Sequence, residues 1–191
     1  MNKPLITKTI GKIDPKKYLK YINENQLNFN NEFNTMHGRE FHFKNAKSYA
    51  LIDEFDCKDF ILYEKFLEIS QDLINILENN YGSGEFWKIQ FAILFGGGKI
   101  LPHYDKHIGF ALSHRIHIPL STNNNVIFTI NNVDCEFYNE GEVIEINNLS
   151  EHSVNNFNPP EHKRIHLIVD YMTSEYLSFI KIEKNINFKY L

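Results

Sequence analysis

Residues 87–105, WKIQFAILFGGGKILPHYD, decide the fold. Apolar side chains recur at every second position over the first half of this stretch, which is the period of a β-strand. One face carries the larger apolar side chains, and the face with Ala92 carries smaller ones. We expect the larger face to pack on a helix and the smaller face to line a barrel. The stretch ends in His103 and Asp105, which point to the same side if the strand continues.

Outward from this strand, the apolar pattern predicts two helices and a series of short strands. The helices are expected at 14–27, opened by Asp14 and Pro15, and at 59–80, where apolar residues recur every three or four positions. Further strands are expected at 39–43, 48–52, 100–104, 114–120, 126–130, 134–138, 143–146 and 164–171. This order predicts a mainly β protein with N-terminal helices, in which a β-sandwich or jelly roll is buttressed by helices.

The length of 191 residues predicts one domain, 1–191. Within it we expect a helical or mixed support region at 1–86, a β core at 87–171 and a C-terminal extension at 172–191. The role of the extension and the oligomeric state stay open.

Composition excludes two classes of partner. A net charge of −4 gives no basic surface of the kind that nucleic-acid binding needs, and no run reaches the roughly 18 to 20 apolar residues of a membrane span. Cys57 and Cys135 are the chain's two cysteines and lie far apart, which favours reduced thiols. We therefore expect a cytoplasmic protein with no nucleic-acid or membrane partner.

His103 and Asp105, with His152 farther along the chain, are the candidate catalytic metal ligands. Two imidazoles and one carboxylate can occupy one face of an octahedral metal and leave the opposite face open, as in non-haem Fe(II) oxygenases. An HxD pair alone is a weak signal, and the alternative is a hydrogen-bonded surface pair with an unrelated loop histidine. The conjunction with His152 and a later arginine favours the metal site.

Arg164 is the candidate for binding the distant carboxylate of a 2-oxo acid that chelates such a metal, because arginine pairs bidentately with carboxylates and stays charged when buried. The alternative is a strand-edge arginine paired with Glu161 or Asp170. Arg115 and His117 share one strand face and can reach a carboxylate of the 2-oxo acid or of the substrate. A histidine bonded to backbone in the core is the competing account of His117.

Four motifs occur in an order that resembles the aspartyl/asparaginyl β-hydroxylase family. They are PHYD at 102–105, RIHIPL at 115–120, GEVIEINNLSEHSVNN at 141–156 and RIHLIVD at 164–170. The resemblance covers roughly residues 87–171. It implies a double-stranded β-helix, also called a cupin-like jelly roll, and an Fe(II)- and 2-oxoglutarate-dependent oxygenase that consumes O₂.

The resemblance also implies roles for the candidate residues. The HxD pair and the distal histidine look like the iron ligands, and Asp105 places the chain nearer the bacterial branch of the family. Arg164 looks like the residue that binds the far carboxylate of 2-oxoglutarate, and Arg115 with His117 resembles the pair that helps to hold this co-substrate. The implied reaction is hydroxylation of an unactivated C–H bond, with release of succinate and CO₂. The substrate is then an amino acid or an amino-acid side chain in a peptide or protein.

Two other functions remain as alternatives. One is a non-catalytic cupin-like protein that binds a metal or a small acid; cupins more often supply several histidines from one motif and a glutamate. The other is a nucleic-acid demethylase of the same superfamily, which is disfavoured by the acidic composition. Of the remaining histidines, His107, His114 and His162 are expected to be solvated.

Overall fold

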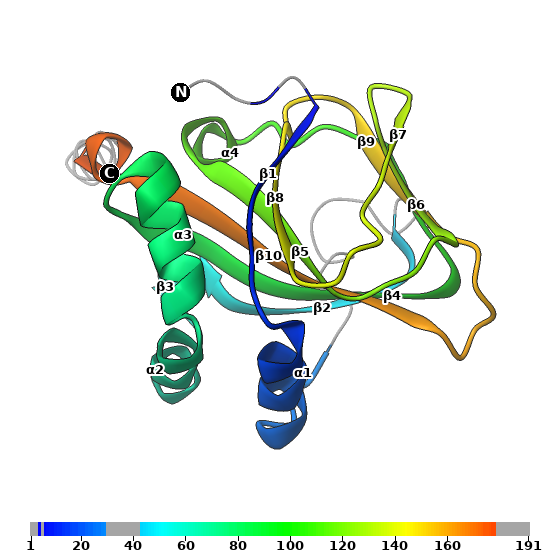
Figure 1. Ribbon diagram of the computed structural model, residues 1–191, viewed down its shortest axis with the longest axis horizontal. Helices are drawn as coiled ribbons and strands as arrows, with labels where there is room; N and C mark the ends of the chain where they lie inside the picture. The colour runs from blue at the N-terminus through cyan, green and yellow to red at the C-terminus, as the bar shows by residue number, and fades with distance from the viewer. Residues whose placement is uncertain (1–3, 5, 30–42, 179–191) are drawn as a thin grey trace, which may run out of the picture.

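The computed structural model describes residue 4, residues 6–29 and residues 43–178. Within these residues, one ten-stranded sheet runs in the order β1-β8-β5-β10-β4-β9-β6-β7, with β2 beside β4 and β3 beside β2. The sheet curls into a nearly closed barrel (Figure 1). The fold is therefore the mainly β jelly roll that the sequence predicts.

The strands are β1 (Thr7–Lys12), β2 (Phe43–Asp53), β3 (Asp56–Cys57), β4 (Gly84–His103), β5 (His114–Ser121), β6 (Val126–Ile130), β7 (Val133–Cys135), β8 (Glu142–Ile146), β9 (His152–Asn156) and β10 (Lys163–Thr173). The helices are α1 (Pro15–Glu24), α2 (Phe60–Ile69), α3 (Gln71–Tyr81) and α4 (Ile108–Leu112).

Strand β4 joins two parts of the barrel. The sequence predicts separate strands on either side of the glycine run, but β4 is continuous over 20 residues. It pairs with β10 as far as Phe95 and with β9 from Lys99 onwards. Between these two partners Gly97 adopts a φ of +70°, which favours glycine, and a Cβ on Gly96 would lie 1.8 Å from the carbonyl oxygen of Pro159. The glycines let one strand change partners and deliver His103 to the barrel end.

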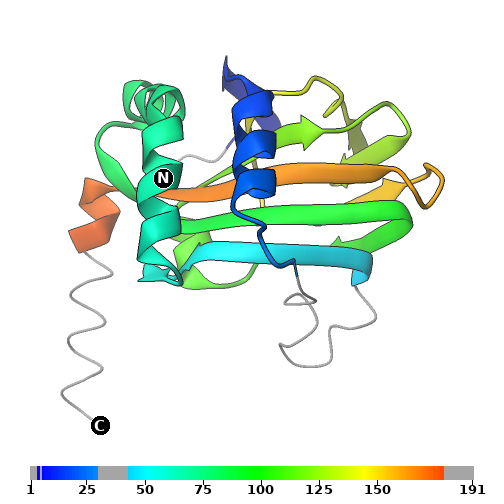
Figure 2. The ribbon, with the colours of Figure 1, turned by 90° about the horizontal axis from the view of Figure 1, so that it is seen from below.

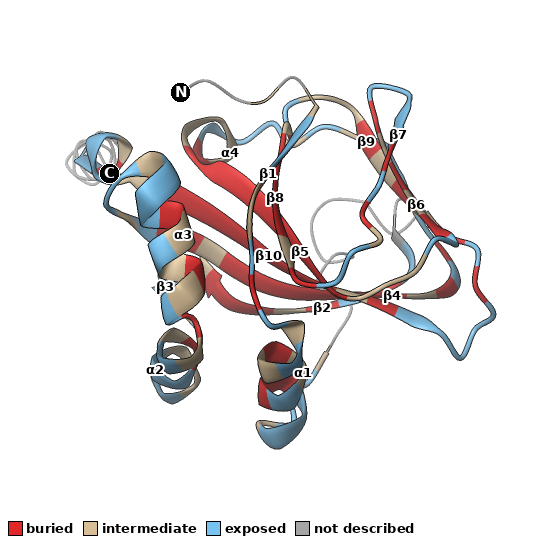
Figure 3. Ribbon diagram, in the orientation of Figure 1, coloured by how far each residue is buried: buried red, intermediate tan, exposed pale blue. Residues whose placement is uncertain are grey.

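The two faces of β4 separate two apolar clusters. Ile89 and Phe91 lie on the outer face and pack with Phe66 and Leu73 of the helices. Leu94 lies on the inner face, in a second cluster formed by residues of β2, β6, β8 and β9. Figure 2 shows the helices against the outer face of the sheet, and Figure 3 shows their buried sides turned toward it. The predicted division into a helix-packing face and a barrel-lining face is confirmed.

The helices differ in detail from the prediction. Helix α1 begins where expected, and the Asp14 side chain accepts a hydrogen bond from the peptide N–H of Lys16 at 3.0 Å. The single helix predicted at 59–80 is wrong, since α2 ends at Ile69 and α3 starts at Gln71. The peptide N–H of Ser70 bonds to the carbonyl oxygen of Leu67, three residues back, which tightens the turn and separates the helices.

Strand β1 was not predicted, and with β2 it brings residues before 87 into the sheet. Most of the strand expected at 39–43 and of the extension at 172–191 lies outside the described residues; residues 174–178 are helical. The division of the chain into support region, core and extension stays a prediction. No helix in the described part of the chain has the length and apolarity to cross a membrane.

Candidate metal centre and co-substrate site

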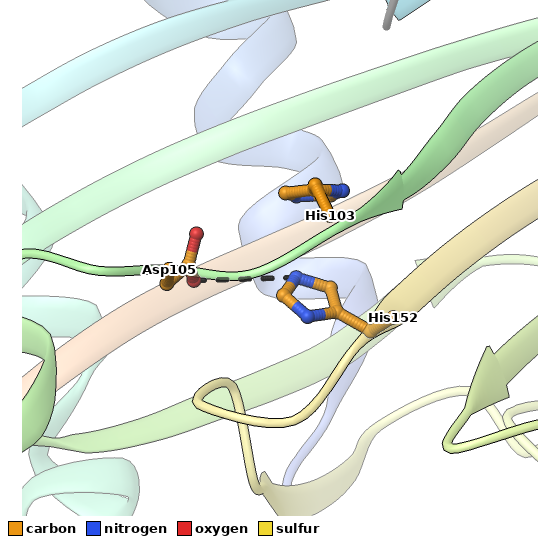
Figure 4. A group of neighbouring side chains, drawn as sticks. All are labelled: His103, Asp105 and His152. Atoms are coloured by element: carbon orange, nitrogen blue, oxygen red, sulfur yellow. Dashed lines mark ion pairs between the residues drawn. The ribbon is translucent and has the colours of Figure 1, made fainter.

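His103, Asp105 and His152 meet at one end of the barrel. His103 is the last residue of β4, His152 is the first of β9, and the two are directly paired across these strands. Asp105 follows two residues after the end of β4. One ligand atom from each residue lies within 4.8 Å of the other two, and Figure 4 shows the three side chains converging. The structure thus assembles the candidate metal ligands.

Both imidazoles are oriented by backbone carbonyls. His103 Nδ1 lies 2.8 Å from the carbonyl oxygen of Leu101, and His152 Nδ1 lies 3.0 Å from that of Ser150. A carbonyl oxygen can only accept, so each Nδ1 carries a hydrogen and Nε2 is the ring nitrogen that can bind a metal. Burial lowers the pKa of His152 to about 4, which keeps this ring neutral at pH 7. This arrangement leaves Nε2 of each ring ready to ligate a metal.

The carboxylate of Asp105 is held by two side chains. Its Oδ2 atom accepts hydrogen bonds from Nη1 of Arg115 and, at 3.3 Å, from Nδ2 of Asn148. The peptide N–H of Asp105 also donates to the carbonyl oxygen of Asn148 at 3.1 Å. Burial raises the pKa of Asp105, but Arg115 and the neighbouring histidines outweigh it and hold the pKa below its ordinary value. Asp105 is therefore an anionic candidate ligand of fixed orientation.

Arg115 in turn is clamped by Asp170. Its Nε and Nη2 atoms donate to the two carboxylate oxygens of Asp170 at 2.8 and 2.7 Å, and Asp170 is 0% exposed. Burial lowers the pKa of Arg115, but Asp105 and Asp170 together raise it above its ordinary value. This arginine thus contacts a candidate metal ligand, Asp105, and a buried aspartate, Asp170.

Arg164 lacks such a partner. It lies on β10 with 2% exposure, and its Nη2 atom donates to Nδ1 of His166 at 2.7 Å. Among the described residues, none accepts a hydrogen bond from Arg164 Nε and no carboxylate forms an ion pair with this side chain. The alternative pairing with Asp170 is excluded because Asp170 binds Arg115. Burial lowers the pKa of Arg164 to about 9, so the guanidinium still carries its charge at pH 7.

His117 lies deep in the barrel between the two arginines. Its ring centroid is 5.4 Å from that of Phe128 and 5.8 Å from that of His166. Burial, followed by the charge of Arg164, lowers the pKa of His117 well below its ordinary value. Its Nδ1 atom has no hydrogen-bond partner among the described residues. The structure therefore supplies no backbone partner for Nδ1.

Sequence reasoning assigned no role beside the candidate metal ligands to two residues that contact this network, and it considered Asp170 only as a partner of Arg164. Asp170 had a usable signal, because positions 164, 166, 168 and 170 of one strand share a face. Asn148 had none, since it lies in the turn before β9 and reaches Asp105 only through the folded loop.

The segment between Asp105 and Arg115 covers one side of the site. It contains the short helix α4, whose Phe110 ring lies 4.3 Å from the guanidinium carbon of Arg115. Trp87 stacks on His107 with ring centroids 5.6 Å apart and an interplanar angle of 3°, and it meets Phe110 edge-on at 5.0 Å. These contacts anchor the loop that follows the metal ligand.

A family model described as aspartyl/asparaginyl β-hydroxylase matches residues 23–174. The chain belongs to this family. It is accordingly a 2-oxoglutarate-dependent hydroxylase. No curated protein sequence matches the chain.

Several solved structures with low sequence identity to this chain have a similar fold. An oxidoreductase of the 2OG-Fe(II) oxygenase family from Burkholderia pseudomallei has a TM-score of 0.62 at 12% identity, covering 87% of this chain and 85% of that chain. A Pseudomonas putida prolyl-4-hydroxylase has a TM-score of 0.52 at 13% identity, covering 87% and 91%. HygX from Streptomyces hygroscopicus, solved with nickel, 2-oxoglutarate and hygromycin B, has a TM-score of 0.55 at 9% identity, covering 88% and 82%.

Proposed function

We propose that this hydroxylase acts on an unactivated C–H bond of an amino acid, either free or as a side chain in a peptide or protein. In this proposal His103, Asp105 and His152 hold Fe(II), and the described donor set fits that metal, since it offers two imidazoles and one carboxylate. When bound, Fe(II) and 2-oxoglutarate supply the oxidising chemistry, with release of succinate and CO₂. The protein orients the ligands, fixes their protonation and keeps the site dry.

The observation that carries the co-substrate assignment is the unpaired charge of Arg164. Burying a cation without an anion is unfavourable by several kcal/mol, and 2-oxoglutarate brings a carboxylate that removes this penalty. The charges also balance. Around the site Arg115 and Arg164 are offset by Asp105 and Asp170. A divalent metal and a dianionic co-substrate then add equal and opposite charge.

The two arginines therefore have different expected roles. Contacts support Arg115 as a positioning residue that acts through Asp105, and its predicted contact with the co-substrate stays a prediction. His117 lies on the same strand face, beside the residues that would surround the 2-oxo acid. We place it against the co-substrate, where its Nδ1 atom gains a partner.

The amino-acid substrate class rests on the family description and on the composition of the chain. The aspartyl/asparaginyl β-hydroxylase family is named for amino-acid side chains, and the net charge of −4 disfavours a nucleic-acid substrate.

Turnover with Fe(II) tests this proposal. The purified protein is supplied with Fe(II), 2-oxoglutarate and O₂ and is screened against free amino acids and short peptides, with succinate as the readout. Substrate-dependent succinate is expected from the wild type. It is expected to disappear in Asp105→Ala and His152→Ala and to persist in His162→Ala, which changes an exposed histidine. Turnover that survives both ligand substitutions contradicts the assignment of the metal site.

A further inference from the structure

Of the buried polar atoms inside the barrel that have no hydrogen-bond partner among the described residues, three lie on β2 and β10. They are Oγ of Ser48, Nε of Arg164 and Nε2 of His166. Ser48 is 0% exposed and His166 is 1% exposed. Buried polar groups are nearly always hydrogen-bonded, so three such atoms in one place need a common explanation.

The strand register places these residues around Ala92. Ser48 of β2 and His166 of β10 are each directly paired with Ala92 of β4, one from either side. Directly paired residues point to the same face of a sheet, and Arg164 shares that face of β10, two residues before His166. This face is the barrel interior, because the ring of His166 lies 6.2 Å from that of Phe137 in the inner apolar cluster.

All three atoms are hydrogen-bond donors. Arg164 can only donate, so Nδ1 of His166 must accept its bond, and the hydrogen of this neutral ring sits on Nε2. Burial, with the nearby charge of Arg164, lowers the pKa of His166 well below its ordinary value, which keeps the ring neutral. The hydroxyl of Ser48 can donate by rotation. Three inward donors around one guanidinium charge suit an anion with several oxygen atoms.

The dimensions suit a carboxylate. Two strand spacings separate β2 from β10, about 10 Å between backbones. Ala92 lies on β4 between these two strands, and its methyl group occupies little of the space above the sheet there. A carboxylate over Ala92 can receive hydrogen bonds from both sides, with each donor within about 3 Å of an oxygen.

We propose that Ser48 and His166 join Arg164 in a three-donor site, centred over Ala92, that selects a co-substrate with a distal carboxylate. This inference rests on the proposed function, since it takes 2-oxoglutarate as the ligand. It adds two residues from different strands to a site for which the sequence offers only Arg164. Ser48 is a specificity residue in this account, and it has no contact with the metal ligands.

The test compares two 2-oxo acids that differ only at the distal end. Binding of 2-oxoglutarate and of 2-oxovalerate, which has a methyl group in place of the distal carboxylate, is measured by titration calorimetry on the Ni(II)-loaded protein. Ser48→Ala is expected to weaken 2-oxoglutarate binding about tenfold or more, the loss typical of a hydrogen bond to a charged group. Binding of 2-oxovalerate is expected to change less than about twofold. The matched control is Ser70→Ala, a buried serine at the junction of α2 and α3, which is expected to leave both affinities unchanged.

The outcomes separate this inference from the proposed function. If the wild type binds 2-oxoglutarate and Ser48→Ala binds it equally well, the three-donor site is refuted while the function stands. An equal loss for both acids also refutes it, because that pattern indicates general disruption. A wild type that fails to bind 2-oxoglutarate overturns both. If Ser48→Ala does not fold, Ser48→Cys tests the same position, and it is expected to show the same selective loss because a thiol is a weak hydrogen-bond donor.

Discussion

Replacing Asp170 with asparagine tests the arrangement that holds Asp105. Asp170 is completely buried and accepts two hydrogen bonds from Arg115, at 2.8 and 2.7 Å. Asparagine has nearly the same shape, but it removes the negative charge and offers one oxygen acceptor instead of two. Arg115 then keeps Asp105 as its remaining anionic partner.

The expected effect follows from these contacts. Removing one partner of a buried ion pair lowers the free energy of unfolding by about 3–5 kcal/mol. The amide oxygen retains one neutral acceptor, worth about 1 kcal/mol. We therefore expect Asp170→Asn to lower the free energy of unfolding by about 2–4 kcal/mol. Because Arg115 orients a metal ligand, Ni(II) affinity is expected to fall about 10- to 100-fold, the range seen for outer-shell partners.

Both quantities are measurable on purified protein. Urea unfolding followed by circular dichroism gives the stability, and titration calorimetry gives the Ni(II) affinity. Asp134→Asn is the matched control, since Asp134 is exposed, and its loss is expected to stay within about 0.5 kcal/mol. A loss below about 1 kcal/mol in Asp170→Asn, together with an unchanged Ni(II) affinity, refutes the reasoning.

Three further outcomes are expected. Burial lowers the pKa of His117 and His166 well below the unfolded value near 6.5, so the folded state binds fewer protons. Their contribution to the free energy of unfolding is therefore fully present above about pH 6.5 and is lost toward pH 5, by up to about 2 kcal/mol per histidine. Urea unfolding midpoints at several pH values measure this loss. Saturating Ni(II) is expected to raise the melting temperature by about 5–10 °C, and His152→Ala to abolish the rise. Gly96→Ala places a Cβ 1.8 Å from the carbonyl oxygen of Pro159 and is expected to lower the free energy of unfolding by about 2 kcal/mol or more.

Each of these expectations has a result that contradicts it. A flat pH profile between 7 and 5 means that the buried histidines accept protons without penalty. A Ni(II)-induced rise that survives His152→Ala places the bound ion elsewhere. Unchanged stability in Gly96→Ala means that β4 and the β9–β10 loop move apart at little cost.

Local periodicity in the sequence was enough to predict the central strand and its two faces. The alternation in 87–95 assigns Ile89 and Phe91 to one side and Leu94 to the other, and the structure confirms both assignments. The candidate metal ligands could be proposed for a related reason, because residues two apart in an extended segment point to the same side. Their meeting with His152 depends on the pairing of β4 with β9, which local sequence pattern does not determine.

Partner choice among charged residues was beyond the sequence. The sequence does not show which arginine Asp170 pairs with, because Arg115, Arg164 and Asp170 all lie on two neighbouring strands. In the structure Asp170 pairs with Arg115, and Arg164 has no carboxylate partner among the described residues. The choice follows from register, which is set by packing over the whole sheet.

His114 shows the same limit, because it was expected to be solvated and is buried. Its Nδ1 atom lies 2.6 Å from the carboxylate of Glu145, which also accepts a hydrogen bond from Tyr81 of α3 at 2.9 Å. This contact joins residues of three separate elements, and the local sequence pattern of none of them predicts it.

The packing of Trp87 has a practical consequence. It is the chain's single tryptophan, and it touches the segment that runs from Asp105 to Arg115 through its contacts with His107 and Phe110. Tryptophan fluorescence of this protein therefore comes from one known location, next to the loop between Asp105, the candidate carboxylate ligand, and Arg115, which contacts it. We expect the emission of Trp87 to change when a metal, a 2-oxo acid or a substrate binds, so binding can be followed in real time without an attached dye.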